Sequence, residues 1–263
     1  MESPNAAEKP SLDPIGRSPL TEFLNGFGIF LLVLLVFMGA QSYFLVRHAA
    51  GSSPEFAGRG LTMGLLNDPA FQERLTDLTD DGDTVSLVSL WSGLLGLVTL
   101  LGFCWWWKRE RIINFLGLRP PALKPLAAWI GLFVLVITAI ELITLLLPEF
   151  DNSFMENVLA SARNKPLLFM GAAIMPAIFE EFFLRGLLYG SLRHVLDKHT
   201  AIAIASGVFT IIHVQYPWYL LALYILPLAV LLGYARANTG SIWTAVVLHL
   251  INNTVSLALP QLP

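Results

Sequence analysis

The feature that most constrains this chain is a series of apolar stretches long enough to cross a membrane as helices. A spanning helix needs about 20 mainly apolar residues, and the first stretch, residues 23–46, meets that requirement. Charged residues make up only 13% of the chain, about half of the usual share in a soluble protein. Such a deficit is expected for a lipid-facing protein, because a charged group at the bilayer centre costs a few kcal/mol or more.

We therefore predict an all-α fold, a polytopic transmembrane helix bundle with about seven spans. The spans are expected at residues 23–46, 85–107, 126–147, 167–189, 201–215, 218–234 and 242–259. The fifth is short and ends near Pro217, which leaves room for a tight re-entrant pair with the sixth. Pro227 is expected to kink the sixth span, and neighbouring helices or water could satisfy the freed backbone groups.

The distribution of lysine and arginine predicts the orientation, because these residues are enriched in cytoplasmic loops. With seven spans, the N-terminus and the second, fourth and sixth loops share one side, which holds eleven of the sixteen basic residues: Lys9, Arg17, Lys108, Arg109, Arg111, Arg119, Lys124, Arg185, Arg193, Lys198 and Arg236. The other side holds Arg47, Arg59, Arg74, Arg163 and Lys165. We predict a multi-pass protein of the cell membrane with a cytoplasmic N-terminus.

Three regions follow from these patterns. Residues 1–22 are expected to form a disordered cytoplasmic N-terminus, because the segment is rich in proline, serine and charge. Residues 23–148 hold the first membrane spans, with an extramembrane loop at 47–84, and residues 165–260 form a second membrane region. The net charge of −3 gives no basic balance that would favour nucleic acid as a partner. The lone Cys104 excludes an intrachain disulfide framework.

Polar side chains within the apolar stretches are the main functional signal. Ionisable groups inside spans are functional candidates by default, and they occur at Glu141, at Glu180 and Glu181, at His213, and at His249 with the nearby amide of Asn253. At about 1.5 Å of rise per residue, the second-region groups lie well inside the membrane. One shared site explains why these groups lie at similar depths better than three unrelated placements do. Glu141 belongs to no motif and is expected to serve as an interhelical hydrogen-bonding group.

Helix spacing separates the two adjacent glutamates. Glu181 and Arg185 are four residues apart and so share a face on which they can form an ion pair. Glu180 points about 100° away on a helix with 3.6 residues per turn, which leaves its carboxylate for chemistry. The alternative is a single interhelical salt-bridge cluster that includes both glutamates and Arg185, since ion-pair networks are often structural.

The set of polar groups suits hydrolysis of an amide bond by activated water. A carboxylate in an apolar pocket can act as a general base beside a histidine. A second histidine and an asparagine amide can donate hydrogen bonds to an oxyanion. The alternative is a metal site, because Glu180, His213 and His249 would form an acceptable catalytic Zn²⁺ shell.

Three motifs, in this order, resemble those of the CPBP family of intramembrane proteases: Glu180-Glu181-x-x-x-Arg185, Phe209-x-x-x-His213 and His249-x-x-x-Asn253. The family includes the CAAX prenyl proteases and the bacteriocin-processing or self-immunity proteins, also called the Abi family. The resemblance implies a CPBP-like catalytic membrane domain at residues 165–260, whereas the N-terminal half shows no match. Some members are described with eight spans, so eight is the alternative count here.

The resemblance also implies a role for each matched residue. Glu180 and His213 would activate water, while His249 and Asn253 would form the oxyanion hole or complete the site. Glu181, Arg185 and Phe209 would support the site. The four-residue spacing of Glu181 and Arg185 suggests the same role for these two residues. Members are commonly named metalloproteases, yet a metal-free glutamate mechanism is argued for eukaryotic relatives, so Zn²⁺ stays an open alternative.

We therefore predict an intramembrane endopeptidase that hydrolyses a peptide bond of a membrane-anchored protein or peptide within the lipid bilayer. Two alternatives from other classes are kept. One is a non-catalytic immunity or partner protein that retains the motifs for packing. The other is a proton-coupled transporter, which would more often show internal repeats and paired broken helices.

Overall fold

The computed structural model describes residues 18–144 and 153–258, and all regular elements in these ranges are helical. Five helices are long and apolar enough to cross a membrane, which confirms the predicted polytopic helical bundle: Pro19–Ser52, Gly82–Leu116, Leu123–Ile143, Lys165–Leu192 and Trp218–Thr239. The apolar helix Ile242–Ala258 is shorter. The predicted segments at 1–17, 145–148 and 259–260 lie outside the described residues.

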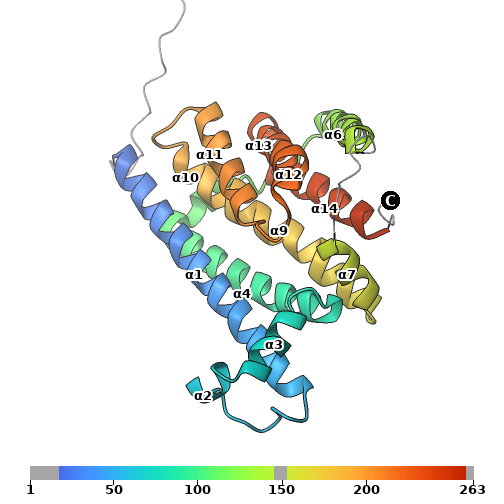
Figure 1. Cartoon of the computed structure of the whole chain (residues 1–263). Coiled ribbons are helices and arrows are strands. Elements are labelled where there is room, and N and C mark those ends of the chain that lie inside the picture. Colours follow the sequence, from blue (N-terminus) through green and yellow to red (C-terminus); the bar gives the residue numbers. More distant parts are fainter. Residues whose placement is uncertain (1–17, 145–152, 259–263) are drawn as a thin grey trace, which may run out of the picture.

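The first two long helices, α1 (Pro19–Ser52) and α4 (Gly82–Lys108), run side by side along one flank of the molecule (Figure 1). Each begins at a side-chain cap. Ser18 accepts a hydrogen bond from the backbone of Thr21, and Asp81 accepts one from Thr84. Such caps satisfy amide groups that have no partner inside the helix. The capped starts therefore fix where each long helix enters the bundle.

The predicted loop at 47–84 contains two short helices, α2 (Met63–Leu66) and α3 (Pro69–Asp77), at the far end of α1 (Figure 1). Phe71 is fully buried there and packs at 5.1 Å, edge to face, on the ring of Phe56. This small apolar cluster is separate from the main core. The loop is thus a folded cap on the long helix pair.

A single helical run from Lys165 to Leu192 passes through the centre of the bundle and carries both adjacent glutamates. It consists of α8 (Lys165–Leu168), the π-helix η2 (Phe169–Ile174), α9 (Met175–Glu180), the π-helix η3 (Glu181–Leu188) and α10 (Tyr189–Leu192). Leu184 and Leu187 are fully buried in the main core. The run is the best-buried of the five membrane helices, which suits a segment that holds ionisable groups away from lipid.

Two of the three π-helical turns stand directly before a proline. The turn η2 ends two residues before Pro176, and η4 (Leu221–Ile225), between α12 (Trp218–Leu220) and α13 (Leu226–Thr239), ends two residues before Pro227. A proline cannot donate to the preceding turn and its ring clashes with the carbonyl four residues earlier. The widened turns relieve this clash. The third π-turn, η3, precedes no proline and contains Glu181 and Arg185; such turns are frequent at functional sites.

The predicted fifth span, residues 201–215, is wrong at its end. Its helix α11 (Lys198–Ile211) has 14 residues, about 21 Å at 1.5 Å per residue, which is less than the hydrocarbon core of about 30 Å. The residue before a proline disfavours helical backbone, and the chain turns before Pro217. His213 consequently lies in the turn after α11, outside any helix.

The remaining helices complete the bundle around the central run. They are η1 (Arg109–Arg111), α5 (Ile112–Leu116), α6 (Leu123–Thr144), α7 (Ser153–Ser161) and α14 (Ile242–Ala258). Helix α6 lies at the edge, against α13 and α14 (Figure 1). Large apolar side chains such as Leu35, Val98 and Leu135 are more than half exposed on α1, α4 and α6. Outward apolar faces of this kind are what a multi-pass membrane protein presents to lipid.

Candidate active site

The two groups predicted to act on water face each other across the end of α11. Oε2 of Glu180, at the end of α9, lies 3.8 Å from Nε2 of His213. Their side chains are 19% and 16% exposed, and Oε2 of Glu180 is itself buried. The separation is too long for a direct hydrogen bond, and Oε2 of Glu180 has no hydrogen-bond partner among the described residues. The pair therefore presents two adjacent acceptor positions to a third molecule.

The hydrogen bond on the other side of the imidazole decides which ring nitrogen of His213 carries its proton. Nδ1 of His213 lies 2.7 Å from the carbonyl oxygen of Phe209. A carbonyl can only accept, so Nδ1 carries the hydrogen, and in the neutral ring Nε2 keeps its lone pair. The lone pair of Nε2 is thus the group that faces Glu180.

Glu181 is turned away from this pair and is the centre of a second, fully buried group. Its Oε1 accepts hydrogen bonds from Nη1 of Arg185 and from Nδ1 of His249, each at 2.9 Å. Arg185 also donates from Nη2 to the carbonyl of Ala229 on α13, at 2.9 Å. The predicted ion pair of Glu181 and Arg185 is confirmed, and Glu180 lies outside it as the helix-spacing argument required.

The ring of Phe209 connects the two groups. It stacks on the imidazole of His213 with centroids 4.4 Å apart and meets His249 edge to face at 5.7 Å. Cζ of Arg185 lies 4.5 Å from the centroid of the same ring, within range of a cation–π interaction. Phe209, 1% exposed, therefore holds both histidines at set distances from the arginine.

Asn253, on α14, makes its side-chain hydrogen bonds to η2 and to Asn252, and among the described residues none to Glu180, His213 or His249. Nδ2 of Asn253 donates to the carbonyl of Ala173 in η2 at 3.4 Å, and Nδ2 of Asn252 donates to Oδ1 of Asn253 at 3.4 Å. Tyr224 in η4 donates its hydroxyl to Oδ1 of Asn252 at 2.8 Å. The side-chain amide of Asn253 is therefore oriented by two neighbouring helical segments.

Two tyrosines that the sequence analysis did not single out as site residues lie next to the predicted groups. Tyr224 is one. Tyr216 is the other: its ring is nearly parallel to the imidazole of His213, 6.4 Å away, and it packs edge to face on Phe154 of α7 at 5.5 Å. Burial and the nearby Glu180 carboxylate raise the pKa of Tyr216, so its phenol stays protonated at neutral pH. The one sequence signal that could have pointed to Tyr216 as a site residue is that it follows His213 by three residues.

The alternative of a zinc shell of Glu180, His213 and His249 finds no support in the arrangement of the described residues. No group of three or more His, Cys, Asp or Glu residues in the described ranges 18–144 and 153–258 is placed to hold a metal ion. The bond from Nδ1 of His249 to Glu181 is of a kind that metal-ligating histidines also make, but it positions His249 within the group centred on Glu181. The hydrolysis proposed below therefore uses no metal-bound water.

Glu141, the remaining membrane glutamate, is exposed on α6, close enough to Tyr224 of η4 to interact with it electrostatically. The motif residues thus fall into two linked sets: Glu180 with His213, and Glu181 with Arg185 and His249. Phe209 contacts members of both.

Residues 162–255 match a family described as type II CAAX prenyl endopeptidase Rce1-like. The matched segment begins near the end of α7 and contains all three motifs. No curated protein and no solved structure matches the chain. The family agrees with the one that the motifs resemble.

Proposed function

Because residues 162–255 belong to the family of Rce1-like type II CAAX prenyl endopeptidases, we propose that this chain hydrolyses a peptide bond of a membrane-anchored protein or peptide. The observation that carries the proposal is the placement of Glu180 and His213. A free carboxylate oxygen and an imidazole lone pair, 3.8 Å apart, are two acceptors that can share the hydrogens of one water molecule.

In the proposed reaction, a water bound between Glu180 and His213 attacks the carbonyl carbon of the scissile bond. Its proton passes to the Glu180 carboxylate, and a tetrahedral oxyanion forms. The protonated Glu180 then donates to the amide nitrogen as the carbon–nitrogen bond breaks, which restores the carboxylate and releases an acid and an amine. General acid–base transfer of this kind contributes about 10²- to 10⁴-fold in rate.

Donors for the oxyanion would come from α14. Nδ2 of Asn253 has two hydrogens, one of which is directed to the carbonyl of Ala173, so the other is available to substrate. Nδ1 of His249 already donates to Glu181, which fixes the orientation of the imidazole and leaves only its Nε2 to face the substrate. Preorganised donors of this kind are worth about 3–4 kcal/mol each.

The test uses the purified full chain in liposomes with quenched-fluorescent peptides, one set carrying a prenylated CAAX terminus and one set a plain membrane anchor. Glu180→Gln should lower cleavage by about 100-fold or more, the loss expected for a general base, with an unchanged unfolding temperature. Glu110→Gln is the matched control, because it removes an exposed carboxylate on η1 that lies outside the three motifs. Equal cleavage by the wild type and Glu180→Gln would overturn the proposal.

A further inference from the structure

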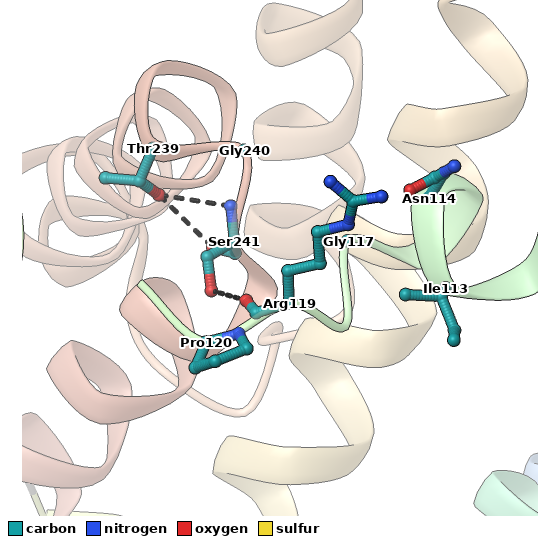
Figure 2. A pocket seen from close by; sticks show the side chains of 8 residues that line it. All are labelled: Ile113, Asn114, Gly117, Arg119, Pro120, Thr239, Gly240 and Ser241. Carbon is teal, nitrogen blue, oxygen red and sulfur yellow. Dashed lines mark hydrogen bonds between the residues drawn. The ribbon is translucent and has the colours of Figure 1, made fainter. Parts of the chain in front are cut away.

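A polar cavity lies between two loops at the ends of the membrane helices (Figure 2). One loop joins α5 to α6, and the other joins α13 to α14. The cavity has a volume of about 380 Å³, and its lining includes Asn114, Gly117, Arg119, Thr239, Gly240 and Ser241. None of the eight residues that line it is acidic, and the only charged one is Arg119. Both loops belong to the side predicted to be cytoplasmic.

Hydrogen bonds between the two loops fix the shape of the cavity. The hydroxyl of Ser241 donates to the carbonyl of Arg119 at 2.6 Å (Figure 2). The backbone amide of Ile242 donates to the carbonyl of Gly117 at 2.9 Å, and Nε1 of Trp243 donates to that of Leu118 at 2.9 Å. The cavity is therefore built before any ligand arrives.

Next to this wall lies an arginine whose Nε is buried without an acceptor. Arg236, in the last turn of α13, is 7% exposed, and its side chain makes no hydrogen bond within the described part of the chain. Its one side-chain contact of note is the ring of Tyr189, 5.9 Å from Cζ. Gly117 separates it from the cavity: a Cβ added there would collide with Cζ and Nη2 of Arg236. The guanidinium of Arg236 thus packs directly against Gly117, one of the residues that line the cavity.

Comparison with the other buried arginine shows how unusual this is. Arg185, 1% exposed, has the Glu181 carboxylate and the Ala229 carbonyl as acceptors. A buried charge without such partners carries a desolvation penalty of several kcal/mol, and an unsatisfied buried group requires an explanation such as an ion that binds there. An anion at the Gly117 loop would supply the missing acceptor.

We propose that the cavity between the 117–120 and 239–241 loops binds a phosphate group, held by Arg119 in the lining and attracted by the charge of Arg236, which packs against Gly117. Guanidinium groups match phosphate oxygens in geometry as well as charge. The rim is suited to a lipid headgroup, because Ile113, one of the lining residues, is 48% exposed and the nearby Trp243 is 36% exposed. Basic pockets between membrane helices on the cytoplasmic side bind anionic headgroups. A free phosphate ester offers the same chemistry, so the test separates the two sources.

The test is native mass spectrometry of the purified full chain with added phosphatidic acid, phosphatidylglycerol or phosphatidylcholine. The wild type should retain the two anionic lipids, and Arg236→Gln and Arg119→Gln should each weaken retention at least tenfold. Arg193→Gln is the control, because this arginine is exposed on the same predicted side and lies outside the cavity. Arg119 is exposed, so its variant keeps the test valid even if Arg236→Gln fails to fold.

A second arm measures the unfolding temperature with inorganic phosphate or glycerol phosphate in place of lipid. A rise that depends on Arg236 and Arg119, without lipid retention, would support the phosphate site and assign it to a soluble ester. The proposal is overturned if lipids and phosphate bind equally to wild type and to both arginine variants, or if neither binds.

Discussion

Nδ1 of His249 donates a 2.9 Å hydrogen bond to Oε1 of Glu181, and the two side chains are only 4% and 0% exposed. The same oxygen accepts from Arg185. One oxygen of the carboxylate that follows the proposed base thus holds a histidine of another helix in place. Glu180 and Glu181 lie in different environments, and the roles that we propose for them differ accordingly.

We predict that Arg185→Leu destabilises the protein by about 3–5 kcal/mol, because it leaves the Glu181 carboxylate buried without its counter-charge. The double variant Glu181→Leu with Arg185→Leu should be less destabilised than the sum of the single variants, since neither charge then remains unpaired. The measurement is unfolding in mixed detergent micelles. Strict additivity of the two substitutions would contradict a buried ion pair.

We predict that Tyr224→Phe lowers kcat roughly three- to tenfold, the worth of one hydrogen bond of about 0.5–1.5 kcal/mol, and leaves KM unchanged. The reason is that Tyr224 orients Asn252 and, through it, the amide of Asn253. Tyr43→Phe on the exposed surface of α1 is the control. A change in KM with kcat preserved would show that Tyr224 acts on substrate binding instead.

We predict that Gly171→Ala destabilises the protein by about 1–3 kcal/mol, the usual cost of overpacking. A Cβ at this position would collide with the backbone carbonyl of Ser86 on α4, which cannot rotate away as a side chain could. Gly131→Ala on α6 is the matched control: nothing lies within 4 Å of its added Cβ, so it should be neutral or slightly stabilising. Equal stability of the two variants would mean that η2 and α4 are less closely packed than the structure places them.

We predict that cleavage persists after dialysis against a strong chelator, because Glu180 and His213 are proposed to activate water themselves. The measurement is peptide cleavage together with metal content of the same sample. Loss of cleavage that added Zn²⁺ restores would instead assign the water to a metal, and His249 would then be the first residue to test as its third ligand.

Part of this architecture follows from local sequence alone. The helical membrane bundle could be predicted because long apolar stretches have no other stable form in lipid. The ion pair of Glu181 with Arg185 could be predicted because four-residue spacing places both on one helix face, and here it persists within a π-helical turn. The end of α11 could not be located in advance, because helix boundaries depend on competing local preferences near Pro217.

What the sequence by itself determined is that polar groups had to be sheltered inside a helical membrane protein, since lipid offers neither water nor hydrogen-bond partners. Which groups meet was decided only by tertiary packing. The packing of α9, α11, α13 and α14 brings His213 close to Glu180 and His249 into a hydrogen bond with Glu181. The same packing buries Nε of Arg236 without an acceptor. That packing is set by side chains far apart along the chain, because contacts between helices depend on shape complementarity that no local spacing encodes.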